Sequence, residues 1–203
     1  MKRVLSAAAV TAAVFLLCSG EAWGFRPARP FKFDISVTGG AGAPNHHVSL
    51  FEDNYRSFSY TDRYTVAEMY SKKLANVEFS GLYSLLFEVR LAKRITVGGE
   101  AMVSKLTGDM YYGFSDTKAE SVSSYAVYIM PEFRFYYYMT RLTSMSGAVS
   151  AGAGFFQDCA NKVSPEYQIK PLAFTIGGRL YAKGELSFGS VFNGVNLGIG
   201  YKF

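Results

Sequence analysis

The sequence predicts an all-β fold, namely a closed antiparallel up-and-down transmembrane β-barrel of about eight strands with long extracellular loops and short periplasmic turns. Three observations predict it: an export signal at the N-terminus, apolar residues at every second position in one segment after another, and connections that alternate between short and long. No stretch after residue 24 approaches the roughly 18 consecutive apolar residues of a transmembrane helix, so strands would have to cross the bilayer.

The first 24 residues have the composition of a cleaved signal peptide. Lys2 and Arg3 form a basic start, residues 4–17 are apolar apart from two hydroxyl side chains, and Ala22 and Gly24 place small residues at a cleavage site. The apolar run is too short to cross a bilayer comfortably, so a retained anchor is the less favoured interpretation. We therefore expect a signal peptide over 1–24 and a single barrel domain over 25–203.

The cysteines and the charge balance narrow the function classes. Cys18 would accept a lipid only after a small residue, whereas Leu17 precedes it, and without Cys18 the remaining Cys159 is expected to be an incidental loop thiol. The chain carries 21 basic and 16 acidic residues, a net charge of +5, without a basic cluster. This pattern does not indicate a nucleic-acid partner, and an anionic lipid surface is the more natural one.

Four strands follow from period-two alternation in the first part of the chain. Apolar and polar residues alternate over 31–38, and again over 77–91, where Val77 and Phe79 share a face with Tyr83 and Leu85. The third and fourth strands are expected over 95–103 and 125–137, the latter with seven apolar positions at this spacing. An amphipathic helix would instead repeat its apolar residues at three and four.

Four further strands complete the count. Apolar residues recur at every second position over 145–155 and over 172–180, a short seventh strand is marked by Leu186 and Phe188, and the eighth runs over 195–203. Pro131 and Pro171 lack the donor that a strand ladder needs, so both are expected at β-bulges.

Short and long connections alternate along this map. Tight junctions are expected at 92–94, 139–141 and 182–184, and longer connections at 40–76, 107–122 and 156–168, while 190–194 is short. In transmembrane barrels the short turns are periplasmic and the long loops extracellular, and an even number of strands places both ends of the barrel sheet on the periplasmic side.

The polar face of the strands lines the interior if the apolar face meets lipid. Acid–base pairs recur on this face, and an eight-stranded barrel has no room inside for all the rings of the other face. We therefore expect a plugged lumen of salt bridges; a soluble barrel with apolar residues inside and a gated ion or proton path are the alternatives. The predicted lumen charge network comprises Glu88, Arg90, Glu100, Glu132, Arg134, Arg179 and Glu185, and further charges on this face are Lys32, Asp34, Glu78, Lys183 and Lys202.

The last strand ends on an aromatic residue and resembles the assembly signal read by the machinery that inserts outer-membrane barrels. This signal comprises Val195, Leu197, Ile199, Tyr201 and Phe203. With this ending and the runs 152–155 and 176–180, residues 29–203 resemble the small eight-stranded outer-membrane proteins, the family of the OmpA membrane domain and OmpX. The resemblance implies the outer membrane of a Gram-negative bacterium and no single activity, because the family includes adhesins, envelope-stabilising proteins and a few lipid-modifying enzymes.

Candidate chemistry is sparse. His46 and His47 are the only histidines, and neighbouring residues on an extended chain point apart, so they form a poor chelating pair. The run from His47 to Ser49 resembles the His-x-Ser motif of an outer-membrane lipid A deacylase, but Leu50 stands where that motif has Asn. We therefore expect no catalytic residue, no metal and no cofactor.

The long connections are the expected contact surfaces. Residues 62–75 have helical spacing and predict a short helix that lies on the outer surface near lipopolysaccharide or closes the barrel mouth. Loops 40–76, 107–122 and 156–168 are candidates for binding a surface ligand. The sequence thus predicts a non-enzymatic outer-membrane protein with a structural or surface-interaction role; a small-solute or ion channel and, further behind, a lipid-modifying enzyme are the alternatives.

Overall fold

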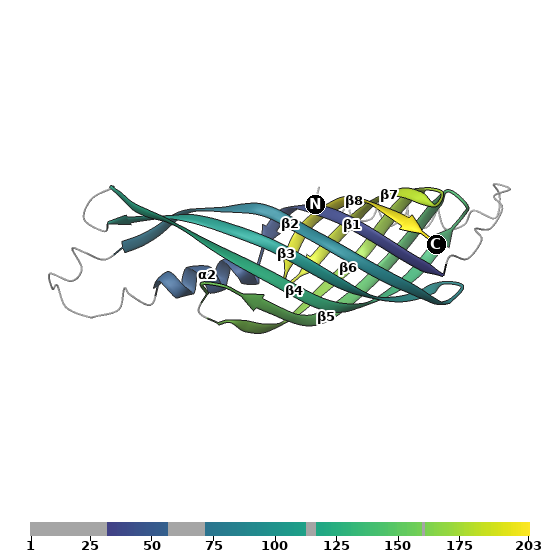
Figure 1. Cartoon of the computed structure of the whole chain (residues 1–203), viewed down its shortest axis with the longest axis horizontal. Coiled ribbons are helices and arrows are strands. Elements are labelled where there is room, and N and C mark those ends of the chain that lie inside the picture. Colours follow the sequence, from purple (N-terminus) through teal and green to yellow (C-terminus); the bar gives the residue numbers. More distant parts are fainter. Residues whose placement is uncertain (1–31, 57–71, 113–116, 160) are drawn as a thin grey trace, which may run out of the picture.

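A computed structural model describes residues 32–56, 72–112, 117–159 and 161–203. Eight antiparallel strands follow one another around a closed barrel, and β8 pairs with β1, as predicted (Figure 1). The predicted signal peptide over 1–24 lies outside the described residues. The strands are β1 (Phe33–Pro44), β2 (Lys72–Ala92), β3 (Ile95–Tyr112), β4 (Lys118–Met139), β5 (Thr143–Phe156), β6 (Val163–Gly177), β7 (Leu180–Gly189) and β8 (Phe192–Lys202), and α2 (His46–Arg56) lies between β1 and β2.

The two ends of the barrel differ. At one end, which we call the turn end, short turns join β2 to β3, β4 to β5 and β6 to β7, and the start of β1 pairs with the end of β8 through Asp34 and Lys202. At the opposite end, the helix end, β1 leads into α2. This arrangement follows from an even number of antiparallel strands, because the first and the last strand then begin and end at the same side.

The barrel is apolar outside and polar inside. Phe33, Phe87 and Phe133 are 43%, 44% and 46% exposed, whereas Glu88 and Arg134 are 2% and 1% exposed. Among the described residues, 30 large hydrophobic side chains are exposed and 25 polar or charged residues are buried. The orientation inferred from the alternation is therefore confirmed, and the arrangement is the reverse of the usual one in water-soluble proteins.

Three neighbouring strands continue past the barrel at the helix end. β2, β3 and β4 have 21, 18 and 22 residues, whereas the other strands have 10 to 15. The pairing of β1 with β2 stops at Gly40 and Leu82, and that of β4 with β5 stops at Ala126 and Phe156, so the outer parts of β2–β4 form a three-stranded extension (Figure 1).

A change of phase in β2 corrects the predicted second strand. Val77 and Phe79 pack against the buried apolar cluster, and Glu78 is exposed on the outside, although Tyr83 points outward as predicted. Register shifts flank this stretch, and Gly81 has a φ of 104°, which only glycine adopts readily. The bulge adds a residue and exchanges the two faces of the strand, so Glu78 does not belong to the lumen.

The junction between β6 and β7 lies earlier than predicted. Gly177, with a φ of 136°, ends β6, and β7 begins at Leu180, so residues 182–184 lie within a strand. Arg179 stands in the turn and is exposed, which corrects its assignment to the lumen charge network. A glycine pair at 177–178 is a stronger turn signal than the single Gly184.

Where the structure describes them, the predicted long loops are largely strand and helix. β3 continues to Tyr112 and β4 begins at Lys118, while β5 and β6 leave only 157–162 between them. In the first connection a helix that was not predicted forms at 46–56. Of the predicted helix 62–75, residues 72–75 belong to β2, and the rest lie outside the described residues. On β2–β4 the outer face becomes polar there, so the apolar alternation that predicted these strands ends before the strands do. On β6, in contrast, the added residues Val163, Tyr167 and Ile169 are apolar and exposed.

The two strand prolines differ. Pro171 lies at register shifts with both neighbouring strands, as expected of a bulge. Pro131, in contrast, pairs with Gly99 in an uninterrupted register, so the bulge predicted there is wrong.

Candidate functional site: the filled lumen

Arg134 of β4 is the centre of a buried ion network inside the barrel. Its guanidinium lies 3.0 Å from a carboxylate oxygen of Glu88, 2.6 Å from Glu132 and 2.7 Å from Glu185. It also donates a hydrogen bond to the hydroxyl of Ser146 at 3.1 Å. These partners come from four strands, so one planar fork of donors joins different sides of the barrel wall.

Lys170 of β6 forms the second node of this network. Its ammonium donates to both carboxylate oxygens of Glu100 at 2.7 Å and to Glu132 at 2.6 Å. Glu132 therefore bridges Lys170 and Arg134. Lys183 adds a third cation, 3.0 Å from Glu185.

The network is nearly balanced and almost completely shielded from water. Four carboxylates, those of Glu88, Glu100, Glu132 and Glu185, meet the three cations of Arg134, Lys170 and Lys183, and none of these residues is more than 4% exposed. Charges withdrawn from water are tolerated only when each has close partners, because desolvating an ion costs several kcal/mol. The lumen is consequently filled by paired side chains at this level.

A second polar layer lies towards the turn end. Tyr181 donates a hydrogen bond to the Asp34 carboxylate, and the Lys202 ammonium lies 4.4 Å from the centre of the Tyr181 ring. Arg90 lies over the Tyr136 ring at 5.3 Å and donates to the sulfur of Met139. Two aromatic rings thus carry cations on their faces beneath the ion network.

An apolar layer seals the lumen at the helix end. Phe51 and Leu50 of α2 pack with Phe156 and Phe192 in one buried cluster, to which β2, β3 and β4 also contribute. The helix presents these residues on one side because His47, Leu50 and Phe51 are three and four residues apart. Its N-terminus is held by His46 N–H, which donates to the Ser190 carbonyl at 2.9 Å.

The two histidines of α2 are held in different ways. His47 is buried between the hydroxyls of Ser104 and Ser124, with its ring nitrogens 3.0 and 2.9 Å from their oxygens. Burial lowers the pKa of His47 from 6.5 to about 4, because withdrawing the ring from water disfavours its charged form. His46 instead lies 2.6 Å from the buried carboxylate of Glu166.

The sequence-predicted lumen residues occupy three positions. Glu88, Glu100, Glu132, Arg134 and Glu185 meet in the ion network, Arg90 lies in the turn-end layer, and Arg179 stands outside the lumen. The predicted assembly-signal residues Val195, Leu197, Ile199, Tyr201 and Phe203 all point outward at the end of the chain.

Sequence reasoning missed Lys170. The residue stands next to Pro171, between the predicted loop 156–168 and the strand predicted from residue 172, and the bulge there breaks the alternation that continues from Ala173. The alternation of Ser164, Glu166 and Gln168 with exposed residues extends to Lys170 and was the signal that could have found it.

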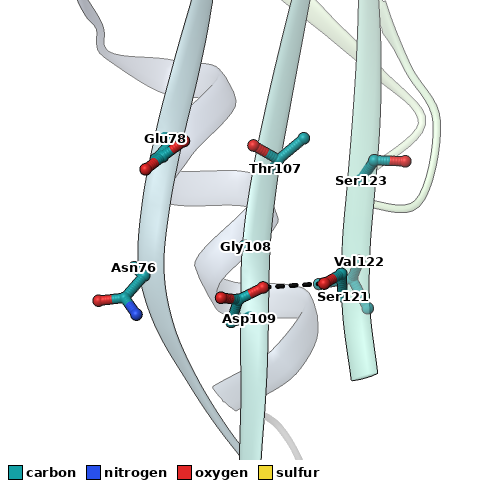
Figure 2. Close-up of a pocket in the computed structure, with 8 residues that line it drawn as sticks. All are labelled: Asn76, Glu78, Thr107, Gly108, Asp109, Ser121, Val122 and Ser123. Carbon is teal, nitrogen blue, oxygen red and sulfur yellow. Dashed lines mark hydrogen bonds between the residues drawn. The ribbon is translucent and has the colours of Figure 1, made fainter. Parts of the chain in front are cut away.

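The outer face of the three-stranded extension is polar and slightly hollowed. A groove of about 420 Å³ runs over Asn76 and Glu78 of β2, Thr107 and Asp109 of β3, and the serines of β4, while α2 lies behind the sheet (Figure 2). Asp109 accepts a hydrogen bond from Ser121 at 2.9 Å and pairs with Lys118 at 2.8 Å. Polar side chains therefore succeed the apolar ones along the outer face of the same strands.

The His-x-Ser motif is not assembled into a catalytic pair. His47 points into the buried cluster, whereas Ser49 is exposed on α2. Cys159 is buried, with its sulfur 3.2 Å from the Ser124 hydroxyl. Within the described ranges, no group of three or more His, Cys, Asp or Glu side chains is arranged to hold a metal ion.

Among the helices of the described part of the chain, none has the length and apolarity needed to span a membrane. Comparison with known proteins finds no matching family model, no matching curated protein and no matching solved structure.

Proposed function

We propose that this chain is an integral outer-membrane protein of a Gram-negative bacterium, with a plugged lumen and a non-enzymatic, structural or surface-interaction role. The observation that carries the proposal is the inverted barrel: 30 exposed large hydrophobic residues outside and a buried ion network inside. Lipid is the solvent that suits such an exterior, and a closed barrel leaves no unpaired strand edge within it.

The height of the apolar belt supports a membrane position. On β4 the belt extends from Tyr125 to Tyr137. Twelve residue steps of about 3.3 Å, tilted by about 40° as in transmembrane barrels, rise roughly 30 Å, which is the thickness of a bilayer core. Tyrosines stand at both limits of the belt, where aromatic residues are enriched in membrane barrels.

The upper limit of the belt is nearly the same on three adjacent strands. Outward residues are apolar up to Tyr83 on β2, Val103 on β3 and Tyr125 on β4. Tyr83 pairs with Val103 in the ladder, and Tyr125 lies two residues beyond Val127, the partner of Val103, toward the helix end. Beyond them the outer face is the polar groove of Figure 2. A common limit favours a single planar boundary, such as the surface of a bilayer, and leaves the extension free to contact other molecules outside the cell.

Two sealing layers favour a plugged lumen over a channel. The apolar cluster around Phe51 closes the helix end, and the ion network around Arg134 fills the barrel below it. The separation of His47 from Ser49 likewise favours a non-enzymatic role over lipid modification.

Heat-modifiable gel mobility tests the membrane proposal. The protein, purified from membranes in detergent, should migrate as a compact band in SDS without boiling and shift to a slower or faster position only after boiling, because membrane barrels resist SDS. Recovery as a soluble protein without detergent, with a single boiling-independent band, would contradict it.

Planar-bilayer recordings test the plugged lumen. Purified protein should add no steady conductance at neutral pH, and reproducible unitary steps would replace this proposal with the channel alternative. A protein that carries Phe51→Ala and Arg134→Ser, which opens both layers, is the comparison that shows whether the recording can detect an opened barrel.

A further inference from the structure

Exposed basic side chains mark every connection at the turn end. Lys93 and Arg94 form the turn between β2 and β3, Arg141 stands between β4 and β5, Arg179 between β6 and β7, and Lys32 precedes β1. All five residues are exposed.

These residues lie on one continuous rim, because backbone hydrogen bonds link each connection to the next. Tyr136 N–H donates to the Arg94 carbonyl at 2.8 Å, and Gly177 N–H donates to the Leu142 carbonyl at 2.7 Å. Lys202 N–H donates to the Arg179 carbonyl at 2.8 Å. Lys32 N–H donates to the Phe203 carbonyl at 3.1 Å, and Arg90 N–H donates to the Lys32 carbonyl at 3.1 Å. The positive charges therefore surround the mouth of the barrel at one level, and we call them the basic rim.

The basic rim has no acidic counterpart at this end within the described residues. None of the five side chains forms an ion pair or a side-chain hydrogen bond there, and the nearby acids Asp34 and Glu88 are buried at 2% exposure with partners of their own. The helix end differs, because exposed acids such as Asp53 and Glu120 accompany its exposed lysines. Over the described ranges, exposed charge is thus distributed asymmetrically along the barrel axis.

The basic rim adjoins the apolar belt directly. Leu142 and Leu180 are 59% and 67% exposed and stand beside Arg141 and Arg179. Phe203 is 61% exposed, and its carbonyl accepts the hydrogen bond from Lys32 N–H. A ring of cations just beyond exposed apolar side chains matches a lipid leaflet, in which phosphates lie immediately outside the acyl chains.

We propose that the basic rim binds the headgroups of anionic phospholipids in the leaflet around the turn end. This inference rests on the proposed membrane location and adds the chemistry of the lipid that it selects. Guanidinium groups bind phosphate oxygens with paired hydrogen bonds, and basic residues beside a membrane are attracted to its anionic lipids. The attraction between exposed charges is screened by salt.

The test compares two bilayers and two matched variants. The full mature protein is folded into nanodiscs of phosphatidylcholine alone or with added phosphatidylglycerol, and the temperature at which the compact gel band is lost is measured. R141Q/R179Q removes two charges from the basic rim, and K118Q/K162Q removes two from the helix end as the control. We expect phosphatidylglycerol to raise the transition temperature of the wild type and of the control, and the rise to fall by half or more in R141Q/R179Q and in high salt.

Several outcomes would overturn the inference. A wild type that is folded in both nanodiscs but has the same transition temperature shows no selection of anionic lipid. If phosphatidylglycerol raises the transition temperature of the two variants equally, the effect is due to overall charge rather than to the basic rim. If inorganic phosphate added to phosphatidylcholine nanodiscs raises the transition temperature of the wild type as much as phosphatidylglycerol does, the effect is due to a free anion. Failure to fold in either bilayer contradicts the membrane proposal itself and is recognised separately by the absent compact band.

Discussion

At the scale of single residues, Arg134 shows how this narrow lumen holds buried charge. Its guanidinium contacts three carboxylates within 3.0 Å, and each of them belongs to a residue on a strand of the barrel wall. The pairs hold strands that are far apart in the sequence, as between β4 and β7. Removing one charge from such a set leaves its partners desolvated and unpaired.

We therefore predict that Arg134→Met destabilises the folded barrel by about 3–5 kcal/mol. Urea unfolding in phosphatidylcholine vesicles, followed by the compact gel band, measures the free energy. Arg179→Met, the same substitution at an exposed turn, should change it by less than about 0.5 kcal/mol. Equal losses in the two variants would mean that Arg134 is not part of a buried network.

His47 makes the stability of the folded barrel depend on pH. Burial lowers its pKa from 6.5 to about 4, so the unfolded chain takes up a proton at a higher pH than the folded one. The stabilisation from the neutral ring is therefore complete above about pH 6.5 and is lost as the pH falls through about 4. Its full size is about 3 kcal/mol.

We therefore predict that His47→Gln flattens the dependence of stability on pH between about 6.5 and 4. Urea unfolding in phosphatidylcholine vesicles at several pH values measures this dependence. His46→Gln, which leaves His47 between Ser104 and Ser124, should keep the His47 contribution. A wild-type slope that survives unchanged in His47→Gln would show that other groups produce it.

At the scale of elements, Gly81 sets which face of β2 points inward at each end. The bulge beside it turns Val77 and Phe79 under the extension and leaves Tyr83 outside. Any residue with a Cβ is strained at a φ of 104°.

We predict that Gly81→Val destabilises the barrel by about 1–2 kcal/mol or more, measured by the same urea titration. Gly99→Val is the matched control, because Gly99 lies on an exposed strand face with no atom within 4 Å of an added Cβ and no positive φ. If both variants lose the same stability, general strand effects rather than the bulge account for the loss.

The strand segments that the sequence predicted are those in which apolar residues lie on one face and polar residues on the other. The period-two signal located β1, the inner parts of β2–β4 and β8, because each alternates exposed apolar with buried polar residues. It failed for the extension, whose outer face is polar and whose inner face packs against α2. The helix itself has its signal in the spacing of His47, Leu50 and Phe51.

At the scale of the whole molecule, the membrane proposal makes the outer surface as sensitive to charge as a protein core. Ile129 lies near the middle of the apolar belt on β4 and is 59% exposed. We predict that Ile129→Arg reduces the free energy of unfolding in vesicles by about 2–4 kcal/mol. Urea titration in vesicles measures this change.

Ser123→Arg on the same strand is the control, because Ser123 belongs to the polar groove beyond the belt and should tolerate the charge. In a water-soluble barrel both exposed positions would accept arginine at little cost. No effect of Ile129→Arg in a folded, vesicle-bound protein would therefore contradict the position of the belt.

The sequence by itself determined the closed eight-stranded barrel and which face of most strands is apolar, because alternation along a strand is a local property. Only the tertiary structure decided which charges meet. It brought Lys170 to Glu132 and Glu100, excluded Arg179 and Glu78, and placed α2 over the mouth. Pairing across a barrel depends on register, and a single bulge or turn glycine, as at Gly81 and Gly177, changes the register or face of every residue beyond it.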